Sequence, residues 1–197
     1  MTIMRTNLSD NGAATTVVSV SEAKTHCRVY HTQDDAYLTS LVLAATDAIE
    51  RETRRAFINR TFQYQLEAFP TSGEIVLPRS PLQSVTSVTY TDTAGASQTL
   101  SASDYVAYSV NGIGRVQLKS TASWPSTQGT GGMDVTVTFV AGYAASAANV
   151  PQLLKQAVML QTAHLYDNRT AVAPAAMYEI PRTVERLIVQ YHSGDYV

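Results

Sequence analysis

Three side chains that can bind transition metals lie close together near the N-terminus: His26, Cys27 and His31. The pattern around them predicts a helix, on which His26 and Cys27 point about 100° apart. No carboxylate or second cysteine completes a tetrahedral set of ligands with them. Cys27 is the only cysteine of the chain, which also excludes an internal disulfide. We therefore expect no metal site here and interpret Cys27 as a small core residue.

Three further signals for chemistry have simpler structural interpretations. Asp34 and Asp35 could serve as paired carboxylates in acid–base catalysis, but acidic residues at a predicted helix start are typical of capping. The stretch "GIGR" at 112–115 is too short for a dinucleotide-binding fingerprint and indicates a hairpin turn. His164 lies on an apolar helix face, which favours a hydrogen-bonded core histidine. With no nucleophile elbow, phosphate loop or zinc-protease helix in the sequence, we predict neither an enzyme nor a cofactor.

The composition is that of a globular protein. Of the 197 residues, 45% are hydrophobic and 15% are charged, and the net charge is −2. Such a chain can bury a core without disulfides, and its charge gives no electrostatic reason to wrap nucleic acid. No apolar run reaches the length of about 18 residues that a transmembrane helix needs. The N-terminus lacks the apolar stretch of a signal peptide, so we expect a soluble protein that is made inside a cell and has no membrane partner.

Charged residues divide the sequence into zones. Residues 61–150 contain 8 of the 30 charged residues and are rich in Ser, Thr, Val and Tyr, the composition of strands and turns. Helical periodicity occurs only on either side of this zone. We therefore predict an α+β fold, in which the two flanks form one helical bundle and a mainly antiparallel β module is inserted between them. The predicted boundaries are a flexible N-terminal arm at 1–18, the helical bundle at 19–60 and 150–192, the β module at 61–149 and a tail at 193–197.

Apolar residues recur at intervals of three and four along two of the predicted helices. One helix lies within 32–57 and the other starts near Pro151, a residue suited to a first helical turn. Packing of these two stripes on each other would create the shared core of the bundle. The candidate core residues are Leu38, Leu41, Val42 and Ile49 on the first helix, and Leu153, Leu154, Ala157 and Val158 on the second.

The second of these helices carries an additional apolar stripe on its polar side, formed by Met159, Ala163 and Tyr166. A helix on the surface of a monomer needs only one such stripe, so something must cover the other. Together with Arg169 at the helix end, these residues are candidates for a subunit interface, where Tyr and Arg are enriched. Two alternatives remain open: the β module covers the stripe, or Arg169 only caps its own helix.

Several segments resemble, in the same order, the head–tail connector (adaptor) proteins of long-tailed bacteriophages and their prophages. The resemblance extends from about residue 19 to 192, and any single piece would be weak evidence. Cys27 and Leu165 depart from the pattern, where leucine and tryptophan are expected, but both positions stay apolar. The matching segments are "SVSEAKTHCRV", "DDAYLTSLVLAATDAIERETRRAF", "LPRSPLQSVTSVTYTDTAG", "DYVAYSVNGIGRVQLK", "SWP", "VTVTFVAGY" and "VPQLLKQAVMLQTAHLYDNR".

This resemblance implies a structural virion protein at the head–tail junction, made and assembled in the cytoplasm of a bacterial host. Such adaptors form a ring, usually of twelve copies, that docks beneath the portal protein and receives a downstream neck or tail-completion protein. DNA would pass through the ring without sequence-specific binding. From the residues alone, two other classes remain open: a non-viral β-rich module that binds a ligand or peptide, and a small hydrolase with an unfamiliar site.

Overall fold

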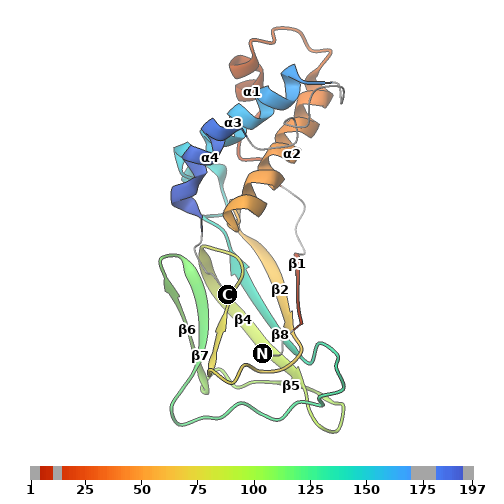
Figure 1. The fold of residues 1–197 in the computed structure, drawn as a ribbon, viewed down its shortest axis with the longest axis vertical. Coiled ribbons are helices and arrows are strands. Elements are labelled where there is room, and N and C mark those ends of the chain that lie inside the picture. The colour runs from red at the N-terminus through yellow and green to blue at the C-terminus, as the bar shows by residue number, and fades with distance from the viewer. Residues whose placement is uncertain (1–4, 11–14, 170–180, 193–197) are drawn as a thin grey trace. The chain divides into compact units, whose positions relative to one another are not determined.

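The structure is a computed structural model that describes residues 5–10, 15–169 and 181–192 (Figure 1). It combines helices with mostly antiparallel strands, which confirms the predicted α+β class. The chain forms two compact units, each built from segments that are distant in sequence. The β unit comprises Met1–Gly12 and Asn59–Tyr143, and the helical unit comprises Ala13–Ile58 and Ala144–Val197. Within the described ranges, no helix is long and apolar enough to cross a membrane.

The larger sheet of the β unit has five strands in the order β1-β2-β8-β4-β5, and every pair is antiparallel. Its middle strand β8 buries every second residue, as its alternating sequence predicts. Phe139 of β8 lies opposite Phe62 of β2, and the two rings stack with centroids 5.6 Å apart. The strands are β1 (Thr6–Asp10), β2 (Arg60–Leu66), β4 (Leu82–Thr91), β5 (Ser97–Thr99) and β8 (Val135–Ala141).

The smaller sheet has three strands in the order β3-β7-β6. Asn111 and Gly112 join β6 to β7, and both have positive φ, which is typical of a two-residue hairpin turn. A hairpin turn is therefore present, but it lies earlier than the "GIGR" prediction placed it, because Ile113, Gly114 and Arg115 belong to β7. A Cβ atom at Gly114 would lie 2.9 Å from the Leu82 side chain, so the close approach of β7 to β4 requires glycine. The strands are β3 (Glu74–Val76), β6 (Tyr105–Val110) and β7 (Ile113–Leu118).

The N-terminal segment departs from the prediction of a flexible arm at 1–18. Residues 6–10 form β1, which pairs with β2 at the edge of the larger sheet, and Val17 and Val18 are buried. This part of the prediction is wrong, because a strand with one apolar residue, Leu8, can be held by backbone hydrogen bonds to an existing sheet edge. Residues 1–4 and 11–14 of the arm, and the tail at 193–197, lie outside the described residues.

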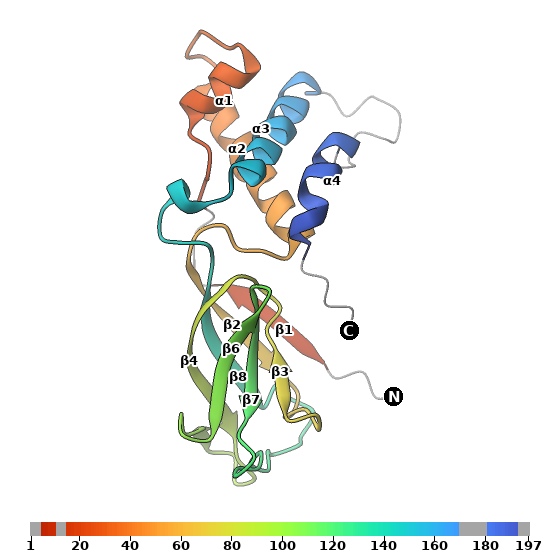
Figure 2. The same ribbon diagram turned by 90° about the vertical axis from the view of Figure 1, so that its left-hand side faces the viewer.

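The helical unit contains α1 (Val20–Cys27), α2 (Asp35–Thr53), α3 (Gln152–Asp167) and α4 (Arg182–Ile188), with short 3₁₀ turns at Ala147–Asn149 and Val189–Tyr191 (Figure 2). Helix α1 begins with a capping box, in which the Ser19 hydroxyl accepts from the Glu22 N–H and the Glu22 carboxylate accepts from the Ser19 N–H. Helix α3 contacts α1, α2 and α4, so it is the centre of this unit.

The core of the helical unit lies between α2 and α3. Of the predicted core residues, Leu38, Val42, Ile49, Leu154, Ala157 and Val158 are completely buried. Leu153 is 39% exposed and Leu41 is half-buried, so the expectation that Leu153 is a core residue is wrong. Each of these two leucines directly precedes a buried residue, and neighbours in a helix point about 100° apart. The buried arcs are therefore narrower than the sequence stripes suggested.

The two adjacent leucines of α3 provide a test of this core. Leu154→Ala should lower the free energy of unfolding by roughly 2–5 kcal/mol, because it leaves a cavity in a fully buried site. Leu153→Ala, the matched control one position away, should cost less than about 1 kcal/mol, because its side chain is exposed. Urea unfolding of the two variants measures the difference. A large and equal loss of unfolding free energy in both variants would show that Leu153 is buried as well. A small loss in both would show that Leu154 is not part of the core.

Candidate interaction surface

A polar network joins the start of α2 to the end of α3. Asp34, the N-cap residue of α2, makes no capping hydrogen bond with its side chain. One of its carboxylate oxygens, Oδ2, instead accepts from the Tyr166 hydroxyl at 2.5 Å and from the Arg169 Nη2 at 2.7 Å. The capping role predicted for Asp34 is therefore wrong in detail, because the carboxylate faces another helix rather than its own backbone.

Two tyrosine rings surround the guanidinium of Arg169. Its Cζ lies 4.4 Å from the ring centroid of Tyr166 and 4.9 Å from that of Tyr37, both within the range of cation–π attraction. The two rings are 6.2 Å apart and tilted by 41°. Arg169 therefore contacts α2 by charge and by stacking. This contradicts the alternative that Arg169 only caps its own helix.

The network changes the acidity of its members. Hydrogen bonds from Tyr166 and Arg169 favour the ionised carboxylate and hold the pKa of Asp34 below its ordinary value. The same contact raises the pKa of Tyr166, because its hydroxyl proton is bound to the carboxylate. The ion pair between α2 and α3 therefore persists at neutral pH and weakens in acid.

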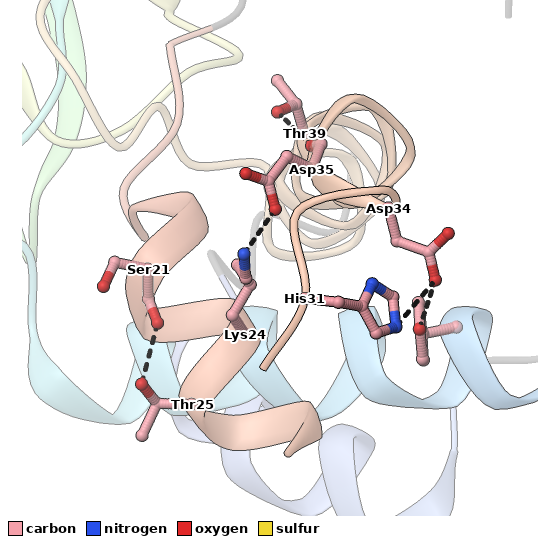
Figure 3. Close-up of polar contacts among 8 residues, drawn as sticks. Ser21, Lys24, Thr25, His31, Asp34, Asp35 and Thr39 are labelled. Carbon is pink, nitrogen blue, oxygen red and sulfur yellow. Dashed lines mark hydrogen bonds and ion pairs between the residues drawn. The ribbon is translucent and has the colours of Figure 1, made fainter. Parts of the chain in front are cut away.

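The neighbouring polar contacts tie α1 to the same end of α2. Lys24 of α1 donates to Asp35 at 2.6 Å, and Thr39 donates to the Asp35 carbonyl at 2.8 Å, as Figure 3 shows. In the connection between the two helices, His31 Nε2 lies 3.9 Å from Asp34 Oδ2. The Asp35 carboxylate thus contacts α1 and the Asp34 carboxylate contacts α3. The two carboxylates therefore do not form the pair that acid–base catalysis would need.

The candidate interface stripe of Met159, Ala163 and Tyr166 is already half-buried within its own unit. Met159 lies beside Ser21, Glu22, Thr25 and His26 of α1 in a shallow hollow, and it is half-buried. Ala163 and Tyr166 are half-buried as well, whereas the Arg169 side chain is 47% exposed. Sequence reasoning missed this cover because it depends on how α1 and the start of α2 fold back onto α3. A further contact of the stripe with a neighbouring subunit stays a prediction.

His26, Cys27 and His31 do not form a metal site in the described structure. In the part of the chain that the structure describes, no three His, Cys, Asp or Glu side chains lie close enough to hold a metal ion. Cys27 is half-buried, and burial raises the pKa of its thiol, which disfavours the thiolate. His164 is half-buried too, and its Nδ1 lies 3.4 Å from the Asn168 amide nitrogen.

The network predicts a pH-dependent stability. Because the pKa of Asp34 is lower in the folded chain than in the unfolded chain, its ionised form stabilises the fold above about pH 4, and this contribution is lost as the pH falls. Asp34→Asn should therefore lower the melting temperature at pH 7, and the difference from the wild type should shrink towards pH 3. Differential scanning calorimetry across this pH range measures it.

The matched control is Asp47→Asn. Asp47 forms an exposed ion pair with Arg51 on α2, at 2.9 Å, and exposed pairs of this kind contribute little. This variant should melt close to the wild type at every pH. If Asp34→Asn behaves in the same way as this control, the network does not hold α2 to α3.

Comparisons with known proteins agree with the resemblance in the sequence. The model of the head completion protein family matches residues 16–176. A chain from the virion of a native gene transfer agent particle is 28% identical, with a TM-score of 0.80, and the alignment covers 96% of this chain and 97% of the other.

Two chains from necks of such particles are also 28% identical. The neck of the empty particle, with C6 symmetry, gives a TM-score of 0.79, and the neck of the native particle, with C12 symmetry, gives 0.77. Both alignments cover 97% of each chain. A search of curated proteins gives no match. Since the family model spans most of its length, the chain belongs to the head completion protein family.

Proposed function

We propose that this protein is a structural component of a virus-like particle, a head–tail connector located at the junction of head and tail. The observation that carries this function is the similarity to neck chains over 97% of the sequence, which includes both the β unit and the helical unit. A shared fold alone would be weaker evidence, because one fold can serve many functions. Here the family model gives the same assignment independently.

The protein acts as a ring of identical subunits. Rotational symmetry of the related necks, C6 in one and C12 in the other, supports self-assembly, and a ring of twelve copies agrees with the C12 case. We further propose that the ring docks beneath the portal protein and presents its other side to a downstream neck or tail-completion protein. In this arrangement each subunit contacts two neighbouring copies through two different surfaces.

DNA passes through the lumen of this ring without sequence-specific binding. The net charge of −2 and the scarcity of Lys and Arg in residues 61–150 support this, because tight binding to DNA depends on neutralising its phosphates. A connector that extends a channel must let the DNA slide. The protein would accordingly work by binding and positioning other proteins, with no chemical reaction of its own.

Deletion of the gene tests this function. Particles made without the protein should accumulate as DNA-containing heads and separate tails, because the link between them is missing. Supply of the full-length chain in trans should restore joined particles, which negative-stain electron microscopy counts directly. Supply of the Leu154→Ala variant gives a control for loss of the folded protein. Normal tailed particles in the deletion strain would refute the connector function.

A further inference from the structure

Strand β6 is an edge strand without the usual protection against pairing with another chain. It pairs with β7 on one side, and among the described residues no strand pairs with its other side (Figure 1). Natural proteins protect such edges with short strands, charges or proline. The other three edge strands follow this rule: β3 and β5 have three residues each, and β1 ends in a charged residue, Asp10. The sequence of β6, "YVAYSV", has six residues and neither charge nor proline.

The outward face of this strand is apolar. Val106 is 47% exposed and Val110 is 46% exposed, and they are among the few large apolar side chains exposed to this degree in the described chain. They lie on either side of Tyr108 on the same face of the strand, since side chains alternate along β6. β-Branched residues and tyrosine also have high propensity for strands. The edge is therefore well suited to accept a further strand or a flat apolar partner.

The Tyr108 hydroxyl is held by a hydrogen bond to Glu74, a carboxylate that also forms an ion pair with Arg115. The hydroxyl donates to Glu74 Oε1 at 2.6 Å, and Arg115 Nη1 donates to the other oxygen, Oε2, at 2.7 Å. This contact links all three strands of the smaller sheet, because Glu74 lies on β3 and Arg115 on β7. A tyrosine fixed in this way loses little entropy on binding, and Tyr with Arg is a composition typical of interface hot spots.

We propose that the β6 edge and its outward face, formed by Val106, Tyr108 and Val110, are a contact between neighbouring copies of this chain in the ring. This inference rests on the proposed function, which requires each subunit to contact two neighbours. Strand β1 is the outer edge of the larger sheet, and Asp10 places a charge at its end. Strand β6 lies beside β4, whereas β1 is separated from β4 by β8 and β2, so the β6 edge and the β1 edge are distant from each other within the β unit. The related necks have the rotational symmetry that such a repeated contact produces.

A photocrosslink identifies the partner of this edge. Val106 is replaced by the photoreactive residue p-benzoyl-phenylalanine, the variant is assembled into particles, and the purified particles are irradiated. The expected product contains two copies of this chain, identified by mass spectrometry of the crosslinked peptides. The same replacement at Ser97, an exposed residue of the short edge strand β5, is the control and should give no such product. A crosslink from position 106 to a different protein, or none, overturns the inference.

The same particles separate failure of this inference from failure of the proposed function. If the wild-type chain is missing from purified particles before irradiation, then the connector function fails. If the chain is present but position 106 does not crosslink to another copy, only the β6 contact fails.

Lysine substitutions test the contribution of the edge to assembly. Val106→Lys combined with Val110→Lys should reduce the amount of chain incorporated into particles by about tenfold or more, because burying two ammonium groups in a contact opposes binding. The matched control, Ser97→Lys with Thr99→Lys on β5, adds the same charge and should be incorporated normally. Circular dichroism and the melting temperature of each purified variant verify that it is folded. Equal incorporation of both variants overturns the inference.

Discussion

The packing of α2 against α3 is the contact on which the rest of the structure depends. The larger segment of the β unit, Asn59–Tyr143, is inserted between these two helices, so their packing brings together the points where the chain leaves and re-enters the helical unit. At these points Ile58 and Ala144 form a parallel β-bridge. A loop of this length closes at a considerable entropy cost, and the buried apolar faces of α2 and α3 offset it. The Asp34 network adds a polar contact at the other end of α2.

The periodicity of the sequence is sufficient to predict the fold class and most of the helices and strands, because it reports directly which face of a helix or strand is buried. The errors lie where burial depends on a neighbour. Leu153 falls within the apolar arc of α3, but the neighbouring helices cover only the part of that arc centred on Leu154 and Ala157. Strand β1 has too few apolar residues to be recognised and is ordered by the edge of β2. Pairings between strands that are distant in sequence carry no local signal at all.

The contacts of the candidate interaction surface also depend on residues that are distant in sequence. Tyr166 and Arg169 were recognisable as unusual residues for a polar helix face, but their partner, Asp34, is 132 residues away from Tyr166 and looked like a capping residue. A carboxylate in the first turn of a helix fits both roles equally well in sequence. Only the three-dimensional structure shows that the backbone of α2 leaves its side chain free to bind α3. Tyr166 and Arg169 therefore stabilise the subunit itself, and a contact of the second stripe with a neighbouring subunit stays a prediction.

The two units differ in how much of their apolar and charged surface has a partner within the same unit. In the helical unit, the second stripe of α3 is half-buried beside α1 and the start of α2, and the charges of Asp34 and Arg169 are paired. In the described part of the β unit, the six-residue edge of β6 and its two exposed valines, Val106 and Val110, are uncovered. In the ring that we propose, this edge offers a neighbouring copy one short strand, whereas a typical stable interface buries roughly 1,600 Å². Such a weak contact favours free subunits in solution and becomes effective when neighbouring copies are held on a common platform, where the effective concentration is high. A small unprotected edge is therefore consistent with a subunit that avoids aggregation before assembly and closes a ring only at the particle.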